Sequence, residues 1–217
     1  MNDGKKLLLT GAGGGMAGLM VGMAGMVFLA TDNQLAGAVL FCIALLSICS
    51  YGMRLFTGSI GYLLTDRETP WTKRLYTAGA IWLGNLAGTT VSGWVVFFMR
   101  PALRDKAQAL CAQKLTLPLW TAFVLAVFCG LLMYLAVDIY RTRTGVYQLA
   151  GIFLAVPVFI MAGFEHSIAD MFYLAASHGV AIYSLPALFF LLVVTLGNAA
   201  GSLLLPLAKE IAAAENR

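Results

Sequence analysis

Long apolar runs separated by short polar segments set the pattern of this chain. Six runs can be followed, at about residues 11–29, 35–64, 75–99, 117–137, 146–176 and 185–208. A helix needs about 20 apolar residues to span a bilayer, whereas the strands of a membrane β-barrel alternate over only about 10 residues. The pattern therefore predicts an all-α polytopic membrane protein with six transmembrane helices, in a single membrane domain over residues 1–217.

Polar residues interrupt two of these runs near their middle. The second run stops at Arg54 and resumes at Ile60, and the fifth run contains Glu165, His166 and Asp170. An ionisable side chain at the centre of a membrane helix costs about 2.5–3.5 kcal/mol on insertion scales, so such residues usually have a function. Irregular backbone at this depth is tolerated only where protein or a water-filled cavity satisfies it. We therefore expect helices 2 and 5 to be broken and His166 to face a pore.

The two halves of the chain repeat one pattern. In each half the second helix breaks near a polar residue, Thr57 in the first half and His166 in the second. In each half the third helix carries a Gly-Asn-x-Ala-Gly string, which contains Asn85 or Asn198. Interrupted helices at matching positions point to a substrate path near the membrane midplane. We expect the two asparagines, at equivalent places beside the breaks, to make hydrogen bonds on the pore side. The alternative is tight helix packing around a satisfied buried amide.

An odd number of helices in each half requires the two repeats to have opposite orientations in the membrane. We expect an inverted pair of three-helix repeats at about residues 7–99 and 115–208.

The composition agrees with a membrane protein and leaves no room for a soluble domain. Of the 217 residues, 60% are hydrophobic and 11% are charged, whereas soluble domains carry about 25% charged residues. In a membrane protein the net charge of +4 reflects the orientation of the chain in the membrane and does not indicate nucleic-acid binding.

Lysine and arginine are distributed unevenly between the two sides that six helices would create. The side with both termini would carry nine: Lys5, Lys6, Arg67, Lys73, Arg74, Arg141, Arg143, Lys209 and Arg217. The other side would carry four, all in or beside the longest polar connection, residues 100–116: Arg100, Arg104, Lys106 and Lys114. Because cytoplasmic segments are enriched in basic residues, we expect a multi-pass protein of the inner or plasma membrane with both termini cytoplasmic.

Motifs for cofactors, metals or catalysis are weak or absent in this sequence. Residues 13–18 match a Gly-x-Gly-x-x-Gly string, but no strand precedes them and no acidic residue follows at the required distance. The four cysteines show no Cys-x-x-Cys spacing: Cys42, Cys49, Cys111 and Cys129. No nucleophile and base pair is evident, so we expect neither an enzyme nor a bound cofactor or metal.

Several strings together carry a resemblance to a known family. Residues 163–169 read Gly-Phe-Glu-His-Ser-Ile-Ala and are followed by Met171 and Phe172, residues 55–57 read Leu-Phe-Thr, and both Gly-Asn strings are present. This combination resembles the formate/nitrite transporter family along essentially the whole chain. The resemblance implies an aquaporin-like inverted-repeat fold and a homopentamer with one pore in each protomer. It also implies passage of small monovalent anions, often with a proton.

The resemblance also assigns roles to individual residues. His166 resembles the central pore histidine, Glu165 the neighbour that orients or polarises it, and Thr57 the threonine that hydrogen-bonds it. Lys114 resembles a lysine at the outer vestibule. The hydrophobic constrictions of the family align with Phe41, Leu45, Phe56 and Phe159. The structural alternatives are an interfacial role for Lys114, loop bracing for Glu165 and ordinary packing for the apolar side chains.

These roles suggest one mechanism and leave the anion open. Lys114 would attract the anion, the apolar rings would remove its water, and His166 with Thr57 would supply a proton or its field. Formate or nitrite is the leading substrate, and hydrosulfide or a short carboxylate such as lactate or acetate is the alternative. A neutral-solute channel of the aquaporin type is disfavoured because the chain contains no Asn-Pro-Ala string. Asp170 departs from the family, in which asparagine is usual at this place.

Overall fold

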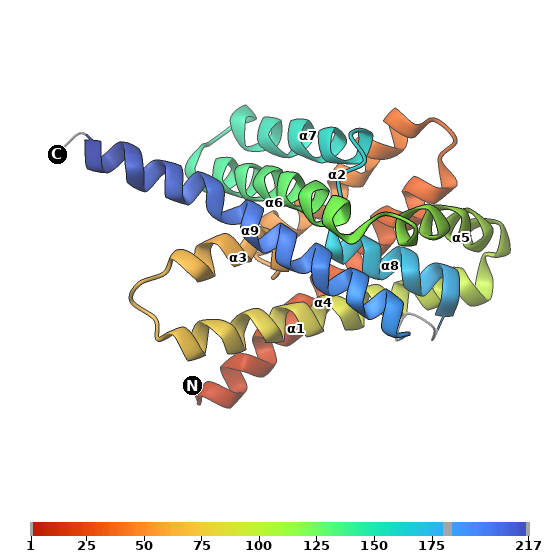
Figure 1. The fold of residues 1–217 in the computed structure, drawn as a ribbon, viewed down its shortest axis with the longest axis horizontal. Helices are drawn as coiled ribbons and strands as arrows, with labels where there is room; N and C mark the ends of the chain where they lie inside the picture. Colours follow the sequence, from red (N-terminus) through yellow and green to blue (C-terminus); the bar gives the residue numbers. More distant parts are fainter. Residues whose placement is uncertain (1, 180–183, 216–217) are drawn as a thin grey trace.

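The computed structural model describes residues 2–179 and 184–215, and all regular structure in these residues is α-helical (Figure 1). This confirms the all-α class. In chain order the helices are α1 (Asp3–Ala30), α2 (Gln34–Ser50), α3 (Phe56–Thr65), α4 (Trp71–Met99), α5 (Pro101–Leu115), α6 (Leu119–Thr142), α7 (Val146–Met161), α8 (Ser167–His178) and α9 (Leu185–Glu215).

Four of the helices in the described residues are long and apolar enough to cross a membrane: α1, α4, α6 and α9. They correspond to the first, third, fourth and sixth apolar runs. Helix α1 begins eight residues before the predicted start at residue 11, and α9 continues past residue 208. The second and fifth runs each form two shorter helices, α2 with α3 and α7 with α8.

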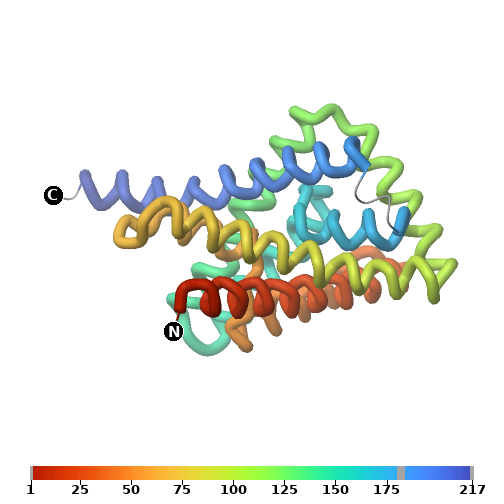
Figure 2. The backbone as a smooth tube through the Cα atoms, turned by 90° about the horizontal axis from the view of Figure 1, so that it is seen from below, coloured from red at the N-terminus to blue at the C-terminus, as the bar shows by residue number. Residues whose placement is uncertain are grey.

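Small residues let the long helices pack in close pairs. Helix α1 lies beside α4 (Figure 2), and α6 packs against α9. A Cβ added at Gly14 would lie 2.8 Å from the backbone oxygen of Ile81, and one added at Gly130 would collide with the backbone of Asn198. Glycine at such contacts allows two helix backbones to approach closely, which is how helices associate in lipid.

Residues 100–116, predicted as the longest polar connection, contain a helix that the sequence pattern did not predict, α5. Pro101 occupies the first turn of α5, a position that favours proline because no helical partner for its missing N–H is lost. Leu103, Ala107 and Cys111 are buried at four-residue spacing, and α5 packs against α8. This buried stripe is narrow and lies among polar and charged residues, so the apolar pattern did not reveal the helix.

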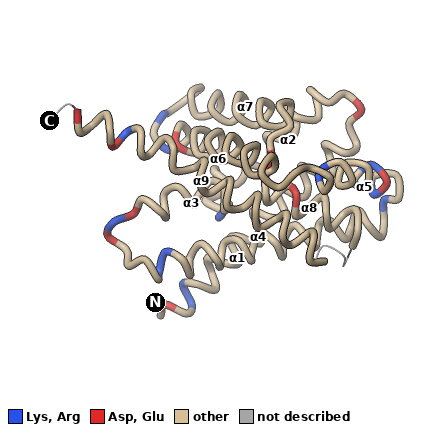
Figure 3. The backbone as a smooth tube through the Cα atoms, in the orientation of Figure 1, with Lys and Arg blue, Asp and Glu red and all other residues tan. Residues whose placement is uncertain are grey.

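Charged residues gather at the two ends of the long helices (Figure 3). Both termini lie at one end (Figure 1), where Lys73 pairs with Asp3 and Arg67 with Glu210, each at 3.0 Å. At the opposite end an ion pair of 3.0 Å joins Lys106 of α5 to Asp32. Arg217, one of the basic residues assigned to the terminal side, and residues 180–183 of the predicted loop lie outside the described residues.

Candidate functional site

The first break in the apolar runs lies between α2 and α3. Gly52 has a positive φ of 64°, and the N–H of Met53 donates to the oxygen of Ile48 at 2.9 Å. A left-handed glycine followed by a bond back over five residues is a common way to end a helix. Arg54 and Leu55 follow, and Leu55, which has an extended backbone, leads into Phe56, the first residue of α3.

The second break, between α7 and α8, has the same backbone design. Gly163 has a φ of 67°, and the N–H of Phe164 donates to the oxygen of Phe159 at 2.9 Å. Glu165 and His166 then lead into Ser167, the first residue of α8. The structural counterpart of His166 is therefore Leu55, not Thr57, with which the sequence pattern paired it.

Asn85 braces the first break. Its Oδ1 accepts the N–H of Phe56 at 2.8 Å, and its Nδ2 donates at 2.8 Å to the backbone oxygens of Arg54 and Gly14. The side chain is fully buried. Two of its three bonds join backbone groups of the break and the start of α3, and the third reaches α1.

Asn198 does the same work at the second break. Its Oδ1 accepts the N–H of Ser167 at 2.9 Å, and its Nδ2 donates to the oxygens of Glu165 and Ala126 at 2.8 and 2.9 Å. Each asparagine thus accepts a hydrogen bond from the first N–H of a short helix and donates to one carbonyl of the break and one carbonyl of a long helix. Such internal partners are what irregular backbone at membrane depth requires.

Thr57 and His166 meet where the two short helices begin. Thr57 lies in the first turn of α3, His166 is the N-cap of α8, and Thr57 Oγ1 lies 2.9 Å from His166 Nε2. Both side chains are buried. The N-terminus of a helix carries partial positive charge and unpaired N–H groups, which favour an anion. Two such ends therefore converge on the hydrogen-bonded pair.

The hydrogen bonds of His166 define its neutral tautomer. Its Nδ1 accepts the N–H of Ala169 at 3.1 Å, so in a neutral ring the proton is on Nε2. Nε2–H then donates to Thr57 Oγ1, and the hydroxyl proton of Thr57 is left to be donated elsewhere. Protonating Nδ1 would break the bond that caps α8.

Aromatic rings pack directly against this pair. Phe159 stacks on the ring of His166, with centroids 5.5 Å apart and planes at 22°. Phe41 meets Phe159 edge-on at 6.4 Å. Leu45, one turn after Phe41, and Phe56, the first residue of α3, are buried in the same core. The structure therefore places Phe159 directly on His166 and Phe41 next to Phe159.

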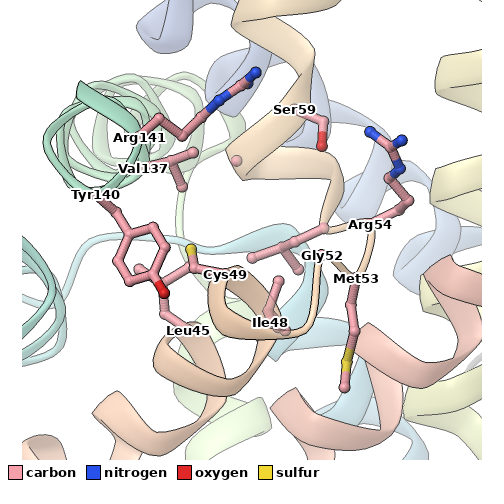
Figure 4. A pocket seen from close by; sticks show the side chains of 12 residues that line it. Leu45, Ile48, Cys49, Gly52, Met53, Arg54, Ser59, Val137, Tyr140 and Arg141 are labelled. Carbon is pink, nitrogen blue, oxygen red and sulfur yellow. The ribbon is translucent and has the colours of Figure 1, made fainter. Parts of the chain in front are cut away.

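A cavity of about 370 Å³ lies beside the first break (Figure 4). Leu45, Ile48 and Met53 form one side of it, and Arg54, Ser59 and Arg141 form the opposite edge. Arg141 stands near the end of α6, beside Asp138, which pairs with Lys209 at 2.6 Å. The cavity is therefore on the side of His166 that faces the terminal end of the molecule.

Lys114, which the resemblance places at an outer vestibule, makes ion pairs with two buried carboxylates. Its ammonium contacts the carboxylate of Glu165 and lies 3.0 Å from Oδ1 of Asp170. Glu165 is 2% exposed and Asp170 is 1% exposed. Asp170 was expected to matter only as the third ionisable residue in an otherwise apolar run, and its pairing with Lys114 was not predicted. In residues 2–179 and 184–215 no three or more His, Cys, Asp or Glu side chains form a group suited to a metal ion.

Most of the chain is similar in sequence to known membrane transporters. A family profile described as "Formate/nitrite transporter" matches residues 5–209. The uncharacterized transporter YwcJ of Bacillus subtilis is 31% identical over 175 residues, which cover 75% of this chain and 68% of that one. The nitrite transporter NirC of Escherichia coli is 29% identical over 206 residues, covering 84% and 75%.

Solved structures show the same fold. A pentameric formate channel with formate bound superposes with a TM-score of 0.81 at 22% identity, covering 95% of this chain and 97% of the other. An ion channel of the FNT family gives a TM-score of 0.82 at 25% identity, covering 94% and 90%.

Proposed function

Because this chain belongs to the formate/nitrite transporter family, we propose that it passes small monovalent anions through a pore in each protomer, formate or nitrite first among them. The family and the fold are those of channels and transporters, not enzymes. One observation carries the assignment: the Thr57–His166 pair at 2.9 Å, placed where two helix N-termini converge in an apolar core. The choice of anions draws on relatives named as a nitrite transporter and a formate channel.

In the proposed topology, α2 with α3 and α7 with α8 are single membrane spans that break at midplane. Together with α1, α4, α6 and α9 they make six spans in one membrane domain, with inverted repeats at about residues 7–99 and 115–208, as in an aquaporin-like fold. The matching hydrogen bonds of Asn85 and Asn198 support this symmetry. In this arrangement the two asparagines hold the breaks in place and do not contact the anion.

The proposed path runs past the rings of Phe41 and Phe159 to the Thr57–His166 pair, then past Leu45 and Phe56 to the arginine-lined cavity. A charged ion that sheds its water among apolar side chains pays a large desolvation cost. The two helix N-termini and the free hydroxyl proton of Thr57 are placed to offset part of that cost beside His166.

We assign His166 the role of a neutral hydrogen-bond donor. The sequence interpretation left open whether it relays a proton or shares one with the anion. Its Nδ1 is occupied by the Ala169 N–H, so a second ring proton would cost the cap of α8. Sharing the Nε2 proton requires no such loss. A proton that accompanies the anion would then come from the vestibule and not from the imidazole.

The surface fits a protomer surrounded by lipid and by copies of itself. Large apolar side chains such as Leu8, Phe98, Trp120 and Leu154 are each about 70% exposed, far more apolar surface than an isolated soluble protein presents. The structural neighbour described as pentameric supports a homopentamer. Of the basic residues, the terminal end holds the larger share, which supports an inner or plasma membrane orientation with both termini cytoplasmic.

The decisive experiment is uptake into proteoliposomes of formate, nitrite, hydrosulfide, lactate, acetate and chloride at acidic and alkaline pH. His166→Asn is measured alongside, since it removes the ring but retains an amide donor. Selective, saturable flux that changes in rate or selectivity in the variant would support the proposal and identify the anion. Hydrosulfide or a short carboxylate as the preferred substrate would select the alternative within the family. Flux of water or glycerol that no anion inhibits would instead indicate a neutral-solute channel.

A further inference from the structure

Three ionisable side chains meet beside His166, and two of them are almost completely buried. Lys114 comes from α5, Glu165 from the second break and Asp170 from the first turn of α8. The single ammonium of Lys114 contacts both carboxylates, so their oxygens lie within about two hydrogen-bond lengths of each other. The two carboxylic side chains are at most 3% exposed, and Lys114 is 17% exposed. We call these three residues the Lys-Glu-Asp cluster.

The charges of this cluster do not balance. One ammonium and two carboxylates give a net charge of −1 if all three groups are ionised. The other titratable groups near Asp170 are Cys111 of α5, Cys129 of α6 and Tyr173 of α8, and His166 adjoins the cluster on the side of Lys114. Of these, only His166 could become positive, and its Nδ1 already accepts a hydrogen bond.

The other helices that pack on α8 supply no compensating cation. Helices α1, α4 and α9 contact α8, but their charged residues stand in the turns at the terminal end of the molecule. Helix α3 carries no charged residue. A net negative charge buried in low dielectric is strongly unfavourable, and buried groups in this situation usually neutralise by taking up a proton.

One atom of the cluster is ready to carry that proton. Asp170 Oδ1 faces Lys114 at 3.0 Å, but Asp170 Oδ2 is buried and has no hydrogen-bond partner in the described residues. An ionised oxygen left in this state bears the full desolvation penalty, whereas a protonated one is neutral and can donate.

We propose that the Lys-Glu-Asp cluster is a buried proton-binding site, which holds one ionised carboxylate, one carboxylic acid and the Lys114 ammonium. Loss of the proton converts the acid to a carboxylate, releases H⁺ to the vestibule water and changes the cluster from neutral to −1. This site is separate from the hydrogen bond that His166 makes with Thr57. Because Glu165 adjoins His166 in the chain, the added negative charge would oppose an anion at the centre of the pore. The effect on flux rests on the proposed function, but the proton itself does not.

Infrared spectroscopy of the full protein in lipid tests for the proton directly. At neutral pH we expect the C=O stretching band of a buried carboxylic acid, insensitive to ionisation of the surface carboxylates. Asp170→Asn and Glu165→Gln should each abolish it, since either change leaves one carboxylate for one ammonium. Asp105→Asn, which alters an exposed carboxylate on α5, is the matched control and should keep the band. Absence of the band in the unaltered protein, or its persistence in both cluster variants, would overturn the proposal.

Flux measurements then test what the proton does. In the unaltered protein anion uptake should decrease as alkaline pH removes the proton. In Asp170→Asn the ratio of acidic to alkaline rates, measured at constant free-anion concentration, should fall to about one, because the neutral cluster no longer titrates. If the band behaves as expected but no anion is transported, the proposed function fails and the proton site stands. Equal pH dependence in the variant and the unaltered protein would refute the gating effect.

Discussion

The two breaks share a backbone and differ in almost every side chain that could perform chemistry. Both begin with a left-handed glycine and both end on an asparagine-braced N–H. At matching positions, however, the first break has Arg54 and Leu55 where the second has Glu165 and His166. The first break faces a cavity lined by exposed arginines, whereas the second break packs around the buried carboxylates of the Lys-Glu-Asp cluster. The repeat thus supplies a common scaffold, while the charge sign and the polar group at the helix cap have diverged.

The largest expected effect comes from removing Lys114, the buried cation that pairs with the carboxylates of the second break. Lys114→Met leaves the ionised carboxylate of the Lys-Glu-Asp cluster buried without a cation, and breaking a buried ion pair in this way costs about 3–5 kcal/mol. Lys106→Met is the matched control on the same helix, because its pair with Asp32 is exposed and worth at most about 1 kcal/mol. Thermal unfolding in detergent measures both.

A rescue variant separates charge from packing in that experiment. Adding Glu165→Gln and Asp170→Asn to Lys114→Met removes the orphaned charge whichever acidic side chain carries it, and most of the lost stability should return. If the triple variant is as unstable as Lys114→Met alone, the packing of the lysine stem and not its charge supports the second break.

The next largest effect tests whether the two braces are equivalent. Asn85→Ala and Asn198→Ala each leave one N–H and two carbonyls of the backbone without a partner. A buried unsatisfied group costs about 1–3 kcal/mol, so each variant should lose several kcal/mol at most and the two losses should be similar. The unfolding midpoint of each variant is the measurement. A much larger loss for one of them would show that only one break depends on its asparagine.

The sequence allowed the scaffold to be predicted better than the chemistry. The apolar runs, their interruptions at residues 51–59 and 163–170, and the paired asparagines are all visible in the order of residues. The ion cluster is not, because Lys114 and Glu165 are 51 residues apart and meet only when α5 packs on α8. Helix α5 was missed for a related reason, since its buried stripe is short and its other faces are charged. A pore role for His166 followed from its place in the apolar run and from the family resemblance, whereas its tautomer follows from the bond that the N–H of Ala169 donates to Nδ1.

A smaller effect probes the contact that joins the two breaks. Thr57→Val keeps the shape of the side chain but removes the oxygen that accepts His166 Nε2–H. One hydrogen bond is worth about 0.5–1.5 kcal/mol, so anion uptake should fall by up to about tenfold. Thr57→Ser retains the hydroxyl and should restore most of the rate. A rate unchanged in Thr57→Val would mean that the two breaks can act without this contact.

The smallest effect concerns the arginine that stands where the second break has Glu165. Arg54→Gln removes a positive charge from the rim of the cavity, and the loss of attraction should lower initial anion rates by about two- to fivefold at low ionic strength. The difference should disappear at high salt, because exposed charges are screened within about 10 Å at 0.1 M. Arg143→Gln, an exposed change at the same end that does not line the cavity, is the control and should change the rate less. A salt-independent loss in Arg54→Gln would instead indicate that its packing against Gly13 holds the first break in shape. In that case the two breaks would differ in how they are built as well as in the charge they carry.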